Sequence, residues 1–117
     1  MSMYREIRKK EGIVTGMPEF GYAGEVPVLR FTAVVRNDMQ TEHTLGKEFT
    51  GVRYCLRGEM AEKARNEGVI SRGVHISHDN ALMNITVMEN MLGKKVSVFS
   101  CYPKELTVSK DGKTFRF

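Results

Sequence analysis

The sequence contains no tryptophan, only two cysteines, and no long apolar run. Cys55 and Cys101 are too few for a disulfide framework, so nothing argues for secretion, and we expect two reduced, half-buried thiols. No apolar stretch approaches the about 20 residues that cross a bilayer. The charged segment 1–11 also lacks the apolar core of a signal peptide. These absences predict a soluble, cytoplasmic protein that does not contact a membrane.

Signatures of catalysis are absent as well. The sequence has no phosphate-loop motif and no legible arrangement of nucleophile, base and acid. His75 and His78 suggest a metal site at first sight. On a strand, however, residues three apart point to opposite faces, and no close cysteine pair completes a ligand set. We therefore expect no enzymatic activity, no metal, no cofactor and no small-molecule substrate.

What the chain does have is an excess of positive charge. Its 117 residues carry a formal net charge of +4, with 41% hydrophobic and 27% charged residues, a composition typical of one globular domain with a modest core. A basic protein attracts nucleic acid or an anionic membrane surface, and charge alone does not choose between them.

The stretch 30–36 alternates with the period of a strand. Phe31, Ala33 and Val35 share one face, whereas Arg30 and Arg36 lie on the other. One face is suited to a core, and the opposite face presents fixed positive charge. This pattern favours a polyanionic partner.

The stretch 49–57 alternates in the same way. Val52, Tyr54 and Leu56 form its apolar face, and the other face holds Phe49, Gly51, Arg53, Cys55 and Arg57. The two strands together predict an aromatic and basic surface, with Phe31, Tyr54 and Phe99 in the core.

The order of the remaining elements indicates the fold class. We expect strands at 4–17, 28–36, 49–57, 69–77 and 96–108, the last interrupted near Pro103. A helix at 59–67 ends at Gly68, and 17–27 and 37–47 are loops. Segment 80–92 is either a helix or a strand, and the tail from 110 is loose. Three strands, a short helix and two more strands is the order of an all-β, five-stranded Greek-key barrel of the OB type. Another small β-barrel or an α+β sheet also fits. The predicted domain covers 1–109, and 110–117 is a short C-terminal tail.

Three segments resemble the bacterial-type single-stranded DNA-binding protein family. Segment 12–19 (GIVTGMPE) resembles the end of that family's first strand, 30–37 (RFTAVVRN) its "RFTLAVNR" strand, and 58–64 (GEMAEKA) its "GKLAE" helix. The order and spacing of the three matter more than any one of them. The resemblance covers roughly residues 12–76.

The sequence also departs from the family pattern. Arg57-Gly58 replaces an aromatic–glycine junction, two extra residues separate Phe49 from Gly58, and the tryptophans on which the family often stacks bases are missing. These departures indicate a divergent member, such as one from a phage or other mobile element, or a relative such as the primosomal replication protein.

The resemblance implies an OB-fold that binds single-stranded DNA with little sequence preference and protects exposed strands during replication or recombination. It also implies a homo-oligomer, either dimer or tetramer. Such binding requires basic residues for phosphates and aromatic faces for bases. The candidate nucleic-acid-binding residues are Arg30, Arg36, Phe49, Arg53, Arg57, Phe20, Tyr22, Arg8 and Lys10.

Alternatives remain open for these residues. The arginines are also typical of solvated strand charges, although we favour the binding role for them. Phe49 is equally typical of a plug at the end of a barrel, and Phe20 and Tyr22 of loop packing. The runner-up function is an OB-fold protein-interaction module of a primosomal or conjugation assembly, without strong DNA binding.

Overall fold

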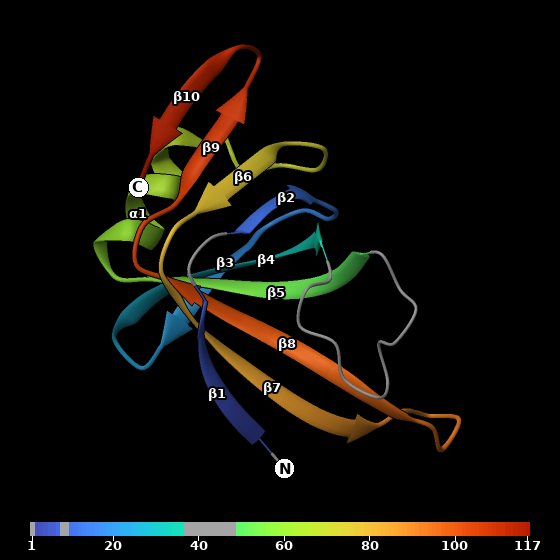
Figure 1. Ribbon diagram of the computed structural model, residues 1–117. Helices are drawn as coiled ribbons and strands as arrows, with labels where there is room; N and C mark the ends of the chain where they lie inside the picture. The colour runs from blue at the N-terminus through green and yellow to red at the C-terminus, as the bar shows by residue number, and fades with distance from the viewer. Residues whose placement is uncertain (1, 8–9, 37–48) are drawn as a thin grey trace.

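The computed structural model describes the backbone of residues 2–7 and the whole of residues 10–36 and 49–117 (Figure 1). The loop expected at 37–47 therefore lies outside the described residues, as does Arg8. The elements are β1 (Ser2–Ile7), β2 (Lys10–Val14), β3 (Glu19–Ala23), β4 (Val26–Arg36), β5 (Phe49–Arg57), α1 (Glu59–Glu67), β6 (His75–His78), β7 (Ala81–Glu89), β8 (Lys95–Pro103), β9 (Thr107–Lys110) and β10 (Lys113–Arg116).

The described strands pair in one continuous order, β1, β7, β8, β5, β4, β2, β6, β9 and β10, with β3 beside β4. β2 pairs with β4, β4 with β5, β5 with β8 in parallel, and β8 with β7. The seam is formed by β1 with β7 and by β2 with β6, where Ile7 faces Ala81 and Lys10 faces His78. This is the all-β OB-type barrel with one short helix that the sequence predicts.

The core follows the predicted alternation of β4 and β5. Phe31, Ala33 and Val35 are at most 4% exposed, and Val52, Tyr54 and Leu56 at most 1%. The rings of Phe31 and Tyr54 face each other across the two strands, with centroids 5.2 Å apart and planes 4° apart. The inner face of β4 and β5 is therefore fixed by packing, and their other residues must face outward.

Helix α1 has the predicted bounds and the predicted C-terminal glycine. Ala61 and Ala64 are buried, and the helix contacts β4 and β5. Gly68 adopts a left-handed φ of 63°, and its N–H donates to the carbonyl of Ala64 at 3.1 Å. Glycine is favoured in this conformation because it has no side chain to clash with the backbone.

Two uncertain segments prove to be strands. The loop predicted at 17–27 is wrong, because β3 and the start of β4 form a hairpin that turns at Gly24, which has a positive φ of 64°. The ambiguous segment 80–92 is resolved as strand β7, with Ala81, Met83 and Ile85 buried at alternate positions.

The C-terminal segment is also more ordered than predicted. β9 and β10 pair as a hairpin, and β9 joins β6. Phe115 and Phe117 pack against the core, and the backbones of Leu106 and Phe117 exchange hydrogen bonds of 3.0 and 2.8 Å. The prediction of a loose tail from Lys110 is wrong because these two phenylalanines bury apolar surface. The predicted strand at 69–77 shortens to β6, and the predicted interruption near Pro103 separates β8 from β9.

Candidate nucleic-acid interface

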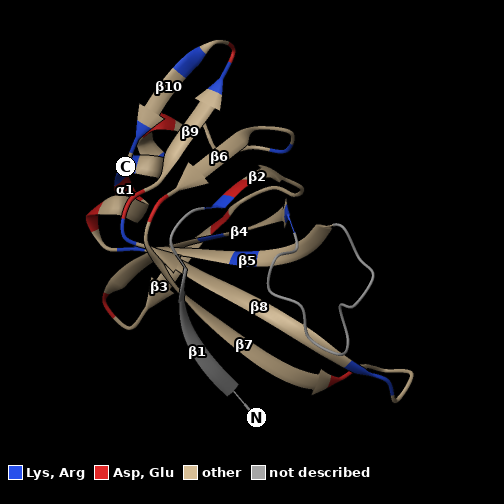
Figure 2. Cartoon of the chain, in the orientation of Figure 1, with Lys and Arg blue, Asp and Glu red and all other residues tan. Residues whose placement is uncertain are grey.

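The outer face of β4 and β5 gathers most of the predicted site residues. Thr32 faces Arg53 and Arg36 faces Phe49 across the two strands, and all four side chains are exposed. Figure 2 shows the basic residues of this face on both strands. Arg30 and Arg57 lie on the same face toward its other end, and both are exposed. The alternation predicted from the sequence is confirmed here.

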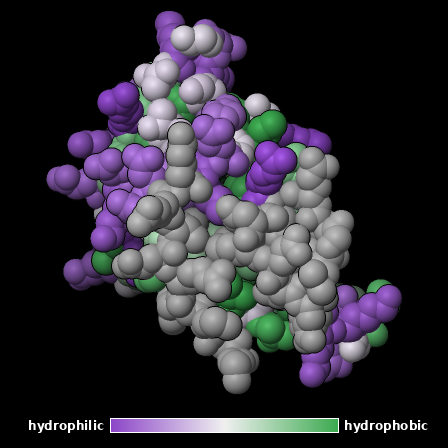
Figure 3. Space-filling model, viewed as in Figure 1, coloured by the Kyte–Doolittle hydropathy of each residue, from purple (hydrophilic) through white to green (hydrophobic). Residues whose placement is uncertain are grey.

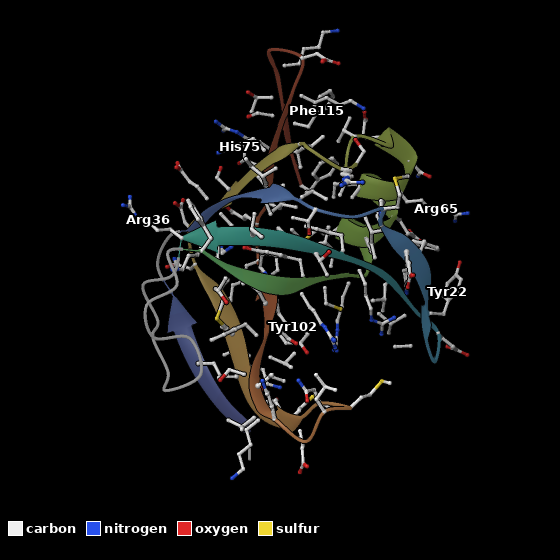
Figure 4. All side chains as sticks on the ribbon, turned by 90° about the vertical axis from the view of Figure 1, so that its right-hand side faces the viewer. Tyr22, Arg36, Arg65, His75, Tyr102 and Phe115 are labelled. Carbon is white, nitrogen blue, oxygen red and sulfur yellow. The ribbon has the colours of Figure 1, made fainter. Side chains whose placement is uncertain are left out.

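One end of this outer face is an arginine cleft of about 460 Å³, defined by Arg30, Arg53, Arg57 and Tyr102. The guanidinium carbon of Arg57 lies 5.4 Å from the centroid of the Tyr102 ring, within the range of a cation–π contact. Figure 4 shows Tyr102 on β8, beside β5. The cleft therefore combines three cationic groups with one half-buried aromatic ring, and it also contains the carboxylate of Glu19, which faces Arg30 across β3 and β4.

Tyr102 lines this cleft but is not among the candidate residues predicted from the sequence. The signal was present, because Phe99 and Cys101 are buried and the strand period then turns Tyr102 outward. The sequence does not reveal that β8 pairs in parallel with β5, and this pairing places the Tyr102 ring beside Arg57.

The other end of the outer face is an apolar cleft of about 540 Å³, defined by Ile13, Val34 and Phe49 with Arg36 and His75 at its rim. Phe49 is 56% exposed and Ile13 49% exposed. No described residue covers these two large apolar side chains, and both lie beside the basic outer face. Such surface is suited to a flat apolar ligand group.

Phe20 and Tyr22 lie on strand β3 rather than in a loop. Their rings meet edge to face at 5.5 Å, and the guanidinium of Arg65 lies 4.2 Å from the centre of Phe20. Arg65 thus covers one face of Phe20, whereas Tyr22 is 63% exposed. In Figure 4, Tyr22 and Arg65 lie at the opposite side of the molecule from Arg36 and His75.

Lys10 is placed differently from the other candidates. It is 6% exposed, and its Nζ donates to the carbonyl of Arg36 at 3.4 Å. Burial lowers its pKa from the ordinary lysine value. Lys10 therefore lies largely buried at the barrel seam, where it also lines the apolar cleft beside Phe49.

A buried polar cluster lies beneath the outer face. Nε2 of His78 is 2.9 Å from the hydroxyl of Tyr54 and 3.8 Å from Sγ of Cys101. Burial lowers the pKa of His78 to about 4 and raises that of Cys101 to about 12. All three groups are therefore neutral at neutral pH.

Away from these clefts, the β7–β8 hairpin carries exposed apolar residues at its tip. Met88 is 50% exposed, Met91 103% and Leu92 81%, beside exposed Lys94 and Lys95. Figure 3 shows this projection, with hydrophobic side chains beside hydrophilic ones. Among the described residues, no helix is long and apolar enough to cross a membrane. Within the same residues, no group of three or more His, Cys, Asp or Glu side chains is arranged to hold a metal ion.

Several solved structures share the architecture of this chain. No family model and no curated protein matches the chain. A small single-stranded DNA-binding protein from Streptomyces coelicolor superposes with a TM-score of 0.61 at 13% identity, over 90% of this chain and 92% of that one. The chain has the fold of bacterial single-stranded DNA-binding proteins. The wild-type protein of this kind from Thermus aquaticus gives a TM-score of 0.59 at 18% identity, over 95% of this chain.

The likeness to these single-stranded DNA-binding proteins confirms the OB-fold predicted from the sequence. Since this chain covers 54% of the Thermus aquaticus protein, it corresponds to about half of that protein's length. The low identities match the divergence seen in the sequence motifs.

Proposed function

We propose that this protein binds single-stranded DNA with little sequence preference and protects exposed strands during replication or recombination in the cytoplasm. The observation that carries the proposal is the outer face of β4 and β5. It places the three guanidiniums of the arginine cleft on one surface with the exposed ring of Phe49. Sequence-tolerant binding of single strands requires this combination of phosphate-neutralising cations and stacking rings.

The outer face has the length that a short single strand needs. From Phe49 to Arg57, eight residue steps of a strand span about 26 Å. OB-folds bind roughly 4–16 nucleotides each, so this path fits the lower part of that range. A strand laid along β5 would meet the apolar cleft at one end and the arginine cleft at the other.

The candidates divide into roles under this proposal. Arg30, Arg36, Arg53 and Arg57 neutralise phosphates, and Phe49 stacks on a base. Tyr22 offers a second ring, which Phe20 supports through their edge-to-face contact. We leave Lys10 out of the interface because its side chain is buried at the seam.

We also propose that the protein forms a homo-oligomer. β3 pairs with β4 alone and β10 with β9 alone among the described strands, so each presents an open backbone edge. An open edge tends to pair with another strand. The apolar tip of the β7–β8 hairpin is additional surface for association.

A protein-interaction module remains the competing function, and the same hairpin tip is the observation that favours it. Met91 and Leu92 are exposed as a protein-binding surface would be. That function, however, gives no role to three arginines in one cleft. We therefore favour a DNA-binding protein without enzymatic activity.

A titration of fluorescently labelled oligo-dT at several salt concentrations tests the proposal. Each phosphate contact lowers log affinity by roughly 0.7 for each log unit of salt, so four to six contacts give a slope of about −3 to −4. Duplex DNA of equal length should bind more weakly because its paired bases cannot stack on protein rings. Undetectable binding of oligo-dT at about 50 mM salt would contradict DNA binding and favour the interaction module.

A further inference from the structure

The outer face of β5 has an open gap at Gly51. A Cβ atom built on Gly51 would have no atom of the described residues within 4 Å, and the backbone there does not adopt a positive φ. Neither crowding nor backbone conformation therefore requires glycine at this position. Glycine in the interior of a strand lowers stability, because it adds no packing and loses more backbone freedom on folding. The open space at Gly51 is therefore available for a ligand group.

The surroundings of the gap are those of a small binding site. Along β5, Phe49 and Arg53 lie two residues to either side and leave the same face. Across the sheet, Gly51 faces Val34 of β4, and Val98 of β8 lines the same cleft as Gly51 and Arg53. The gap thus has two half-buried valines beside it, a ring at one end and a cation at the other.

We propose that one nucleobase of the bound strand stands over Gly51, with one face against the ring of Phe49 and the guanidinium of Arg53 on its other side. We name Phe49, Gly51, Arg53 and Val34 the base site. The inference rests on the proposed single-stranded DNA binding and assigns one of its contacts.

The spacing along the strand suits a flat ring. Residues on one face of a strand recur every ~6.6 Å, and stacked atoms lie ~3.5–4 Å apart. A base stacked on Phe49 would therefore fill the space between that ring and position 51, where glycine leaves room for it, and the long side chain of Arg53 can reach across position 51 to its other face. Any side chain at position 51 would occupy the space that the base needs.

The chemistry of the site favours a base over other occupants. The Phe49 ring is 56% exposed and free to stack, and Arg53 adds a cation–π partner. The arginine cleft continues from Arg53 to Arg57 on the same strand and Arg30 on β4, so phosphates attached to the base have cationic partners nearby. A hydrophobic peptide side chain would make no use of these charges.

The test replaces Gly51 with valine, a residue well suited to a strand. We expect Gly51→Val to keep or raise the melting temperature and to weaken oligo-dT binding roughly 5- to 150-fold, the range that one stacked base provides. Gly51→Ala, which adds a single methyl group, should cause a smaller loss. Gly21→Val is the matched control, because Gly21 also lies within a strand, has no positive φ and has nothing within 4 Å of its Cβ position.

A second probe separates a base site from a general steric block. An oligonucleotide of equal length and charge with abasic sugars should bind the wild type more weakly than oligo-dT, and Gly51→Val should remove most of that difference. Phe49→Trp adds a reporter to a chain that has no other tryptophan. Its fluorescence should be quenched by oligo-dT, and much less so when Gly51→Val is also present.

The outcomes distinguish the two proposals. If the wild type binds no oligo-dT, both the proposed function and the base site fail. If the wild type binds and Gly51→Val binds equally well, or weakens oligo-dT and abasic chains by the same factor, DNA binding stands and the base site is overturned. An equal loss in the Gly21→Val control overturns it as well.

Discussion

The hydroxyl of Tyr54 lies 2.9 Å from Nε2 of His78 inside the barrel, and the two rings meet edge to face at a centroid distance of 5.4 Å. Tyr54 belongs to β5 and His78 to β6, so the contact joins the strand of the outer face to the barrel seam. Burial raises the pKa of Tyr54, so its hydroxyl stays protonated and shares a hydrogen bond with a neutral imidazole. The interior of the barrel therefore contains an uncharged histidine.

This contact predicts a loss of stability in mild acid. The pKa of His78 is about 4 in the folded protein against an ordinary value of 6.5, because burial, with a smaller contribution from Lys10, disfavours the cation. The unfolded chain therefore binds more protons between these values. Stability is complete above pH 6.5 and falls toward pH 4 by up to about 1.4 kcal/mol per pH unit.

Thermal melts between pH 7 and pH 5 measure this effect before most carboxylates titrate. His75→Gln is the control, since His75 lies on the same strand but is exposed. That variant should keep the pH dependence, whereas His78→Leu should flatten it. A wild type whose melting temperature does not change over this range would contradict the assignment.

The sequence was sufficient where one periodic pattern decides the structure. β4, β5 and α1 were predicted because each has one buried face and clear ends, such as Gly68 after the helix. The outward direction of Arg30, Arg53 and Arg57 followed from the same alternation. These parts of the fold depend on local information.

The sequence was insufficient where a distant partner decides the structure. Lys10 belongs to a run of charges that is typical of solvated surface, and only its pairing with His78 at the seam buries it. Phe115 and Phe117 follow a polar turn, and their burial depends on a core assembled by other strands. Tyr102 gained its place in the arginine cleft from the parallel pairing of β8 with β5.

Open strand edges lead to a prediction about oligomeric state. Light scattering at micromolar concentration should give a mass that is a multiple of 13.3 kDa. Met91→Lys with Leu92→Lys, at the hairpin tip, tests whether the apolar tip contributes to association. A mass of one chain at all concentrations would rule out the proposed homo-oligomer without affecting DNA binding.

Tyr102 provides a test of the arginine cleft itself. The ring is half-buried and lies 5.4 Å from the guanidinium of Arg57. Under the proposed function, it holds that side chain in place and stacks on a base. Tyr102→Ala should weaken oligo-dT binding by about 1–3 kcal/mol. Tyr102→Phe keeps the ring and should bind nearly as the wild type, as measured by fluorescence anisotropy. Equal losses in both variants would instead assign the effect to the hydroxyl.

The last prediction separates the two faces of β5. Arg53 is exposed and Tyr54, the next residue, is 1% exposed, so the two side chains report on opposite sides of one strand. Arg53→Ala should leave the melting temperature nearly unchanged and reduce the magnitude of the salt slope by roughly 0.7, the share of one phosphate contact. Tyr54→Ala should instead lower stability by about 3–5 kcal/mol, since it removes a buried ring and the partner of His78. Salt titrations and melts of both variants make the comparison. If Tyr54→Ala weakened binding at unchanged stability while Arg53→Ala left the salt slope intact, the DNA would have to contact the opposite face of this strand.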